Sequence, residues 1–283
     1  MVHLAHLVNP FRPVSDASMS FAQSITLETM RIARDEALKG GVAVALLSAQ
    51  FPEDHTVVPE YFTKTPDLER SAVDFQSFSR PKKLPLIADL LDRLYHATEA
   101  PYLIYTNVDI SVQPHFYLEV ARKIASGLDA FIINRRRLPD HFRSPEELPQ
   151  MYAHPGFPHP GFDCFVFRRE LYPLFRLGHV CIGIPFVEIT LSQNLFCYAR
   201  KFELFDRDFL TFHIGLEIFK KRDPEYLRFN KTEFWKCVDL LWPDLDSRKF
   251  PWGERSFLYR IIRWGLHPCI PIRLALMLET RRR

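Results

Sequence analysis

Two polar side chains that could bind a metal ion and a phosphate follow an apolar run near the middle of the chain. Residues 102–106 are mostly aromatic and β-branched, and Asn107 and Asp109 come directly after them. We expect a buried strand here, and in an open α/β sheet ligands bind beyond the carboxyl ends of the strands. Hard divalent cations prefer oxygen ligands such as carboxylates and substrate phosphates. The alternative interpretation is an Asn/Asp turn that only satisfies its own backbone.

The placement of this Asn-x-Asp pair resembles the short acidic DxD element of GT-A fold glycosyltransferases, in particular the family-2-like members of the nucleotide-diphospho-sugar transferase superfamily. The resemblance implies that Asn107 and Asp109 contact the donor and that Asp109 binds Mn²⁺ or Mg²⁺. It also implies a late histidine as a further metal ligand, and His213 lies at the matching place. On residue type alone, a histidine among apolar neighbours is more often a satisfied core residue.

Three further residues are candidates for contacts with a nucleotide-sugar donor. Asn9 follows the first expected strand, which in GT-A domains usually meets the nucleotide. Arg80 and Lys82 precede an expected helix, whose amino end favours anions. In the enzymes that the chain resembles, a basic residue at this place commonly contacts the nucleotide-sugar. A solvated basic turn is the competing interpretation.

Two acidic residues later in the chain are candidates for the catalytic base. Asp163 lies near the start of an expected strand, in a Gly-Phe-Asp segment that resembles the acceptor-facing Gly-x-Asp element of GT-A enzymes. Glu188 begins an expected helix at the place of their xED element, where this chain reads Phe-Val-Glu. In those enzymes the element acts as base or orients the acceptor. Both carboxylates also have a structural interpretation, as a turn cap or as a partner of the helix dipole.

Basic and histidine side chains are candidates for acceptor binding. Arg135 opens a run of three arginines after an expected strand, and such a run could bind phosphate or another anion. A solvated charged edge would also explain the run. His154 and His159 lie in the stretch 138–161, which we expect to be irregular. Long loops in compact domains are usually functional, so we interpret this one as an acceptor-side loop or lid.

The elements that must position these residues alternate between strands and helices. A strand, a helix and a strand over residues 3–8, 26–39 and 42–48 predict a right-handed βαβ unit. Further helices are expected at 84–97, 114–126 and up to 198, and further strands at 129–134 and 161–167. Residues 202–205 and 210–215 close the domain. We therefore predict an α/β protein with a GT-A (Rossmann-like), mostly parallel sheet flanked by helices. It would occupy residues 1–250, with a basic amphipathic extension over 251–283.

Composition and charge limit the function classes. The 283 residues include 47% hydrophobic and 25% charged residues, which is ordinary for a globular protein. A net charge of +3 is too small to imply a nucleic-acid partner. Five scattered cysteines suggest no disulfide framework, so we expect a cytoplasmic protein. The extension mixes aromatic residues with arginines, which allows either a helix packed on the domain or a peripheral membrane contact.

Together these features predict a metal-dependent glycosyltransferase that moves a sugar from a nucleotide-diphosphate donor to an unknown sugar, lipid or small-molecule acceptor. One alternative is a nucleotidyltransferase on a similar sheet, which would use a glycine-rich loop after the first strand. Residues 9–13 contain no glycine. The other alternative is a non-catalytic sugar-nucleotide-binding domain, which remains open because Asn107 replaces the first acidic residue of the DxD element.

Overall fold

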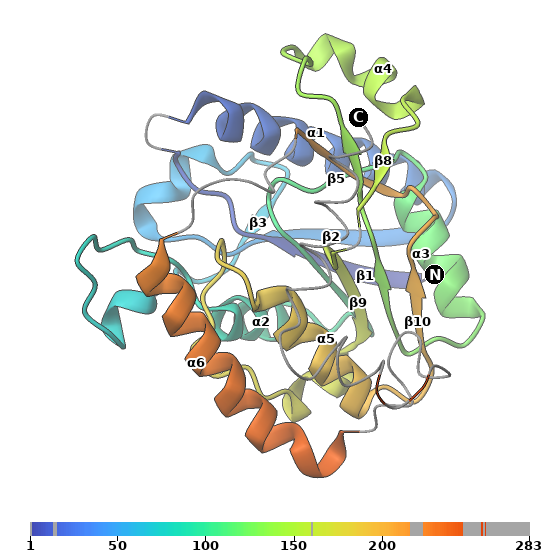
Figure 1. The fold of residues 1–283 in the computed structure, drawn as a ribbon. Helices are drawn as coiled ribbons and strands as arrows, with labels where there is room; N and C mark the ends of the chain where they lie inside the picture. The colour runs from blue at the N-terminus through green and yellow to red at the C-terminus, as the bar shows by residue number, and fades with distance from the viewer. Residues whose placement is uncertain are drawn as a thin grey trace.

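The computed structural model describes residues 2–13, 16–159, 161–215 and 223–245, together with Ser256 and Leu258. It contains a large central sheet, a small second sheet and helices on both faces of the large sheet (Figure 1). The large sheet consists of β1 (Val2–Val8), β2 (Val42–Ser48), β3 (Thr63–Lys64), β4 (Tyr102–Thr106), β6 (Ala130–Ile133), β9 (Cys164–Arg168) and β10 (Phe202–Phe205). The small sheet consists of β5 (Ser111–Val112), β7 (Arg136–Leu138), β8 (Phe157–Pro158) and β11 (Thr211–Ile214).

The helices lie between these strands along the chain. The α-helices are α1 (Ala17–Lys39), α2 (Ile87–His96), α3 (Phe116–Ala125), α4 (Leu148–Ala153), α5 (Val187–Tyr198) and α6 (Pro224–Leu241). Short 3₁₀ helices span Pro52–Val57, Ala72–Asp74, Pro145–Glu147, Arg169–Leu174 and Trp242–Asp244. The alternation of strands and helices in the first half of the chain follows the sequence prediction, whereas α6 was not predicted.

The large sheet has the order β10-β6-β9-β4-β1-β2-β3. All neighbouring strands pair in parallel except β9, which runs antiparallel between β4 and β6. This confirms the predicted α/β fold with a mostly parallel sheet. The antiparallel strand matters for the site, because its beginning meets the carboxyl ends of its two neighbours.

Both faces of the sheet are covered by helices, which explains why its strands are continuous apolar runs in the sequence. Leu4 and Ile104 point to the face that packs against α1 and α3, and both are fully buried. Ala5 and Leu103, their neighbours along β1 and β4, point to the face that packs against α2 and α5. Two cores therefore form, one on each side of the central strands.

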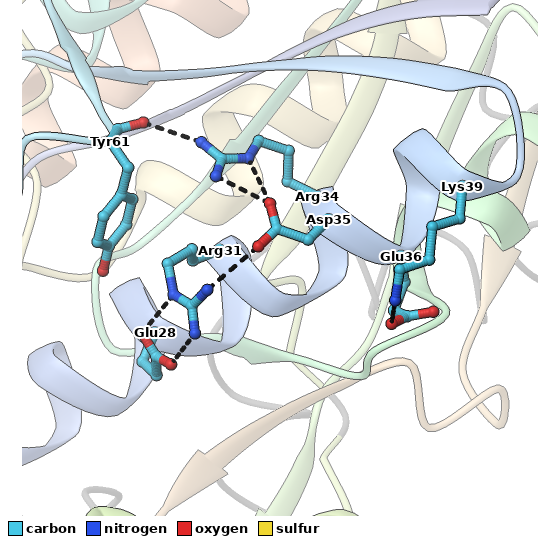
Figure 2. A network of polar contacts seen from close by, with 7 residues as sticks. All are labelled: Glu28, Arg31, Arg34, Asp35, Glu36, Lys39 and Tyr61. Atoms are coloured by element: carbon cyan, nitrogen blue, oxygen red, sulfur yellow. Dashed lines mark hydrogen bonds and ion pairs between the residues drawn. The ribbon is translucent and has the colours of Figure 1, made fainter.

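Helix α1 begins nine residues earlier than the pattern predicted. Asp16 caps it, because its carboxylate accepts a hydrogen bond from the backbone N–H of Met19. The outer face of the helix carries charged pairs such as Arg31 with Glu28 and Asp35 (Figure 2). Such exposed pairs contribute little to stability, so the buried face of α1 holds the helix in place.

The stretch 138–161 is more ordered than expected. It contains α4 and β8, and Ser144 begins the 3₁₀ turn before α4 with a capping box. The guanidinium of Arg136 donates to the carbonyl oxygens of Met151 and Tyr152 at the end of α4. This contact attaches the segment to the small sheet.

The predicted extension over residues 251–283 lies outside the described residues apart from Ser256 and Leu258, so its boundary and its membrane contact stay predictions. In the part of the chain that the structure describes, no helix is long and apolar enough to cross a membrane.

Candidate active site

Three ends of strands converge at one edge of the large sheet. In the register of the antiparallel strand, Cys164 on β9 lies opposite both Thr106 on β4 and Ile133 on β6. Asp163 therefore lies between the two segments that leave β4 and β6. Those segments carry Asn107 and Asp109 on one side and the arginine run on the other.

The segment after β4 is a tight turn. The backbone N–H of Ile110 donates to the carbonyl oxygen of Asn107 at 3.1 Å. Asn107 is exposed, and its side-chain oxygen accepts a hydrogen bond from the Tyr105 hydroxyl at 3.0 Å. Asp109 is directed inward instead, with 16% of its side chain exposed. The two polar residues of the pair thus occupy different environments.

The small sheet brings His213 to Asp109. Strand β5 follows the turn immediately, and Ser111 and Val112 pair with Phe212 and Thr211 on β11. Continued by one residue, this antiparallel register places Ile110 opposite His213, so Asp109, the preceding residue, lies diagonally across from His213. The Nε2 atom of His213 lies 3.2 Å from Oδ2 of Asp109, and the His213 side chain is only 3% exposed.

The second ring nitrogen of His213 fixes the orientation of the imidazole. Its Nδ1 atom lies 3.2 Å from the carbonyl oxygen of Gly215, which can only accept a hydrogen bond. Nδ1 therefore carries the proton. Nε2 faces the Asp109 carboxylate. It either carries a second proton, which the carboxylate accepts, or presents a lone pair, and in that case a cation between the two groups would bind both. Histidines that bind metals commonly donate their other N–H to a backbone carbonyl in this way.

The electrostatics of Asp109 favour its carboxylate form. Burial raises its pKa, but the hydrogen bond from His213 and the positive charge of Arg135 lower it more, to about 2. Its Oδ1 atom is buried and has no hydrogen-bond partner. A divalent cation fits this arrangement, because Oδ2 of Asp109 and Nε2 of His213 face each other. The described residues contain no group of three or more ligating side chains, so protein atoms alone would not complete a coordination shell.

A buried ion pair lies next to this carboxylate. Nη1 of Arg135 donates to Oδ1 of Asp163 at 2.5 Å, and the two side chains are 13% and 7% exposed. Burial raises the pKa of Asp163 above its usual value, and the positive charge of Arg135 offsets only part of this rise. The backbone N–H of His159 donates to the carbonyl oxygen of Arg135 at 3.2 Å. Burial, with the charges of Arg135 and Arg137, holds the pKa of His159 well below its usual range, so its imidazole is neutral.

Five of the residues singled out from the sequence therefore gather in one place, which we call the strand-end cluster. Its members are Asp109, Arg135, His159, Asp163 and His213. Sequence reasoning did not connect Arg137 to it, although His213 and Arg137 are direct neighbours in the β11–β7 register. The only signal was the position of Arg137 in the arginine run.

The other predicted site residues have local structural contacts. Asn9 is buried at the end of β1 and donates to the carbonyl oxygen of Ala49 at 2.6 Å. His154 accepts a hydrogen bond from the backbone N–H of Gly156. Glu188 lies in the first turn of α5, after Phe186, whose φ of 92° is in the left-handed region.

The basic tract before α2 is directed toward α6. Lys82 lies 3.6 Å from Asp223 and 5.7 Å from the ring centre of Tyr226, both on or next to the amino end of α6. Arg80 is exposed. The tract does not adjoin the amino end of α2 as expected, because the helix starts only at Ile87.

Comparisons with known proteins give information about the fold. No protein-family model matches the sequence, and no curated protein matches it significantly. Among solved structures, residues 1–349 of TarS from S. aureus, in complex with UDP-GlcNAc, are similar. The identity is 10%, the match covers 92% of this chain and 69% of that chain, and the TM-score is 0.50. Glucosyl-3-phosphoglycerate synthase from Mycobacterium tuberculosis, in complex with phosphoglyceric acid, matches with 14% identity over 87% of this chain and 82% of that chain, with a TM-score of 0.48. The likeness to TarS confirms the predicted GT-A fold.

Proposed function

We propose that this chain is a glycosyltransferase that moves a sugar from a nucleotide-diphosphate donor to the hydroxyl group of an acceptor. The observation that carries the proposal is the state of Asp109 at the carboxyl end of β4. This residue is a carboxylate at neutral pH, one of its oxygens is buried without a partner, and His213 faces the other. In a GT-A fold this edge of the sheet is where a ligand binds.

Asp109 and His213 would hold Mn²⁺ or Mg²⁺, because the carboxylate and the imidazole face each other. The cation, when bound, would supply positive charge that stabilises the departing diphosphate. The remaining ligands would be diphosphate oxygens and water, which is usual for cations held by one or two protein groups. Gly215 would keep the His213 ring in place through its carbonyl oxygen.

Donor binding would use residues along the same edge. Asn107 is exposed at the end of β4, and Asn9 lies at the end of the neighbouring strand β1. We assign both to contacts with the nucleotide or its ribose. Arg80 and Lys82 remain donor candidates, but Lys82 would first have to leave Asp223.

The acceptor proton would be taken by Glu188 or Asp163. Asp163 has a buried Oδ2 atom without a partner, and burial raises its pKa, and both features favour it as the base. Its Oδ1 atom is engaged by Arg135, whose charge offsets only part of the rise in pKa. Glu188 lies at the amino end of α5, where the helix dipole also stabilises the carboxylate. Arg135, His154 and His159 would lie on the acceptor side.

The proposal is tested by incubating the protein with a panel of nucleotide-sugars and Mn²⁺ or Mg²⁺ and measuring release of nucleoside diphosphate. TarS was solved with UDP-GlcNAc, which makes UDP-sugars the first donors to try. We expect release that requires the cation and that is lost in Asp109→Asn but kept in the exposed control Glu60→Gln. A nucleotidyltransferase would instead release pyrophosphate from a nucleoside triphosphate, and a non-catalytic binding domain would bind donors without turnover.

A further inference from the structure

Buried polar atoms without hydrogen-bond partners are concentrated in the strand-end cluster. Native proteins leave few such atoms unpaired, so a concentration of them indicates a place where a ligand supplies the partners. In the cluster these atoms are Asp109 Oδ1, Arg135 Nε, His159 Nδ1 and Asp163 Oδ2, and Oδ1 of Asn134, the residue before Arg135, shares the property. They come from segments that are far apart in the sequence and meet at one edge of the sheet.

Arg135 has hydrogen-bonding capacity that the protein does not use. A guanidinium carries five N–H donors in a planar fork. Its contact with Asp163 uses Nη1, while Nε is buried and unpartnered. The side chain is 13% exposed, so solvent reaches little of it. A group that accepts a hydrogen bond from Nε, preferably an anion, would provide the missing partner of this guanidinium.

The charge balance on this side of the cluster is positive. The charges of Arg135 and Arg137 both act on the buried His159, and Asp163 is the carboxylate that pairs with Arg135. Burial lowers the pKa of Arg136, whose guanidinium is directed to carbonyl oxygens at the end of α4. Asp109, the other nearby carboxylate, is paired with His213. Buried positive charge is unfavourable without an anion.

His159 places a neutral side chain next to the Arg135 guanidinium. Its main chain is bonded to Arg135, so the imidazole is held beside the guanidinium. Because the ring is neutral and its Nδ1 atom is unpartnered, it can donate a single hydrogen bond without adding charge. A guanidinium and an imidazole N–H together suit a tetrahedral or planar oxyanion.

We infer that the acceptor substrate carries an anionic group, a phosphate monoester or a carboxylate, which binds to Arg135 and His159 while Asp163 holds the Arg135 guanidinium in place. The inference rests on the proposed function, because it assigns this oxyanion to the acceptor rather than to the donor. The donor diphosphate would lie on the opposite side of the cluster, at Asp109 and His213.

The binding test uses inorganic phosphate as the probe and follows broadening of its ³¹P NMR signal. Phosphate is titrated into the apo protein and into protein saturated with UDP and Mg²⁺. The variants are Arg135→Lys, Arg135→Gln/Asp163→Asn and the exposed control Arg122→Gln. The double variant removes both charges of the buried pair, so it avoids leaving Asp163 charged and unpaired. Circular dichroism establishes that each variant is folded.

We expect phosphate to bind in the presence of UDP and Mg²⁺. Its affinity should fall at least about tenfold in the double variant, as expected for the loss of a charged hydrogen bond, and stay unchanged in Arg122→Gln. Arg135→Lys should bind with intermediate affinity, because a lysine keeps the charge but not the fork. Equal phosphate affinity in the folded double variant would overturn the inference. So would displacement of phosphate by UDP, because Arg135 would then be a donor-phosphate contact.

An acceptor panel separates the two sources of the oxyanion. Hydroxyl compounds that carry a phosphate, a carboxylate or no charge are compared with the same UDP-sugar donor. We expect kcat/KM to be at least about tenfold higher for one of the anionic classes than for its neutral counterpart. Preference for the neutral compounds would contradict the inference. If the proposed function is wrong, the protein will not bind UDP, which is a different result. The phosphate titration of the apo protein then still decides whether the strand-end cluster binds an oxyanion.

Discussion

His213 and Asp109 face each other at 3.2 Å although they lie in opposite halves of the chain. The contact depends on the small sheet, whose strand β5 begins two residues after Asp109 and pairs with the strand that carries His213. The Gly215 carbonyl oxygen holds the other side of the ring. A rigid pair of this kind suits a site that must bind one ion in one geometry.

The two candidate bases can be separated by their kinetic effects. If Glu188 takes the acceptor proton, Glu188→Gln should lower kcat by about 10²–10⁴-fold with little change in donor affinity. If Asp163 only holds Arg135, Asp163→Asn should mainly raise the acceptor KM. Steady-state kinetics with donor and acceptor varied independently distinguishes these patterns. Full turnover by Glu188→Gln would remove Glu188 from the mechanism, and the large kcat effect should then appear in Asp163→Asn.

Gly156 is expected to be needed for the segment that carries His159. Its φ is 59°, and an added Cβ would lie 3.0 Å from the Arg137 carbonyl oxygen. Gly156→Ala should therefore lower the free energy of unfolding by more than the about 1–2 kcal/mol that a left-handed conformation alone costs. Gly41→Ala is the matched control, because Gly41 has a φ of 77° and nothing within 4 Å of the added Cβ. Urea unfolding of both variants measures the difference, and equal losses would show that the Gly156 contact is unimportant.

Asn230 is expected to position the loop before α5. It is fully buried, accepts a hydrogen bond from the backbone N–H of Cys181 and donates to the carbonyl oxygens of Cys181 and Pro185. Asn230→Ala would leave these backbone groups unpaired, at a cost of about 1–3 kcal/mol for each group. Thermal or urea unfolding should show this loss, while the exposed neighbour variant Lys231→Ala should be close to the unmodified protein. A stability within 0.5 kcal/mol of the control, about the scatter of surface substitutions, would contradict this role.

His6 should make stability fall as the pH is lowered. Burial lowers its pKa from 6.5 to about 3, so the unfolded chain takes up a proton that the folded chain refuses. The free energy of unfolding should therefore decrease below pH 6.5, by about 1.4 kcal/mol per pH unit, until about pH 3. Both ring nitrogens of His6 form hydrogen bonds, with the hydroxyls of Tyr117 and Thr106. His6→Gln will therefore also reduce the free energy of unfolding at neutral pH.

The diagnostic quantity for His6 is the slope and not the absolute stability. Between pH 7.5 and 5.5, urea unfolding of His6→Gln should show a smaller decrease than the unmodified protein, while His3→Gln keeps the full decrease. Identical slopes for His6→Gln and the unmodified protein would mean that the histidine is not held neutral.

Much of the large sheet could be predicted because its strands are buried on both faces. Continuous apolar runs identified β2 and β4 with the observed boundaries. The first turns of α1 were missed, because they precede the periodic apolar stripe and begin at a polar cap, Asp16. The strands of the small sheet are two to four residues long, too short for a period to be detected.

The candidate site could be predicted residue by residue but not as an arrangement. Asp109 was identified from its position at an expected strand end, and Asp163 and His213 were identified from a resemblance. Nothing in the local sequence indicates that Arg135 pairs with Asp163, because that contact depends on β9 running antiparallel between β4 and β6. Lys82 was expected at a helix amino end and instead contacts α6, a helix that the sequence pattern did not reveal.

Calorimetric titration of UDP shows whether Asp109 and His213 bind a nucleotide diphosphate together with a divalent cation. The titration is carried out with Mn²⁺ and with EDTA, on the unmodified protein, Asp109→Asn, His213→Ala and the exposed control Glu60→Gln. We predict that UDP binds more tightly with Mn²⁺ than with EDTA in the unmodified protein and in Glu60→Gln, and that both site variants lose this dependence while remaining folded. Mn²⁺-dependent UDP binding of unchanged affinity in Asp109→Asn would contradict the account.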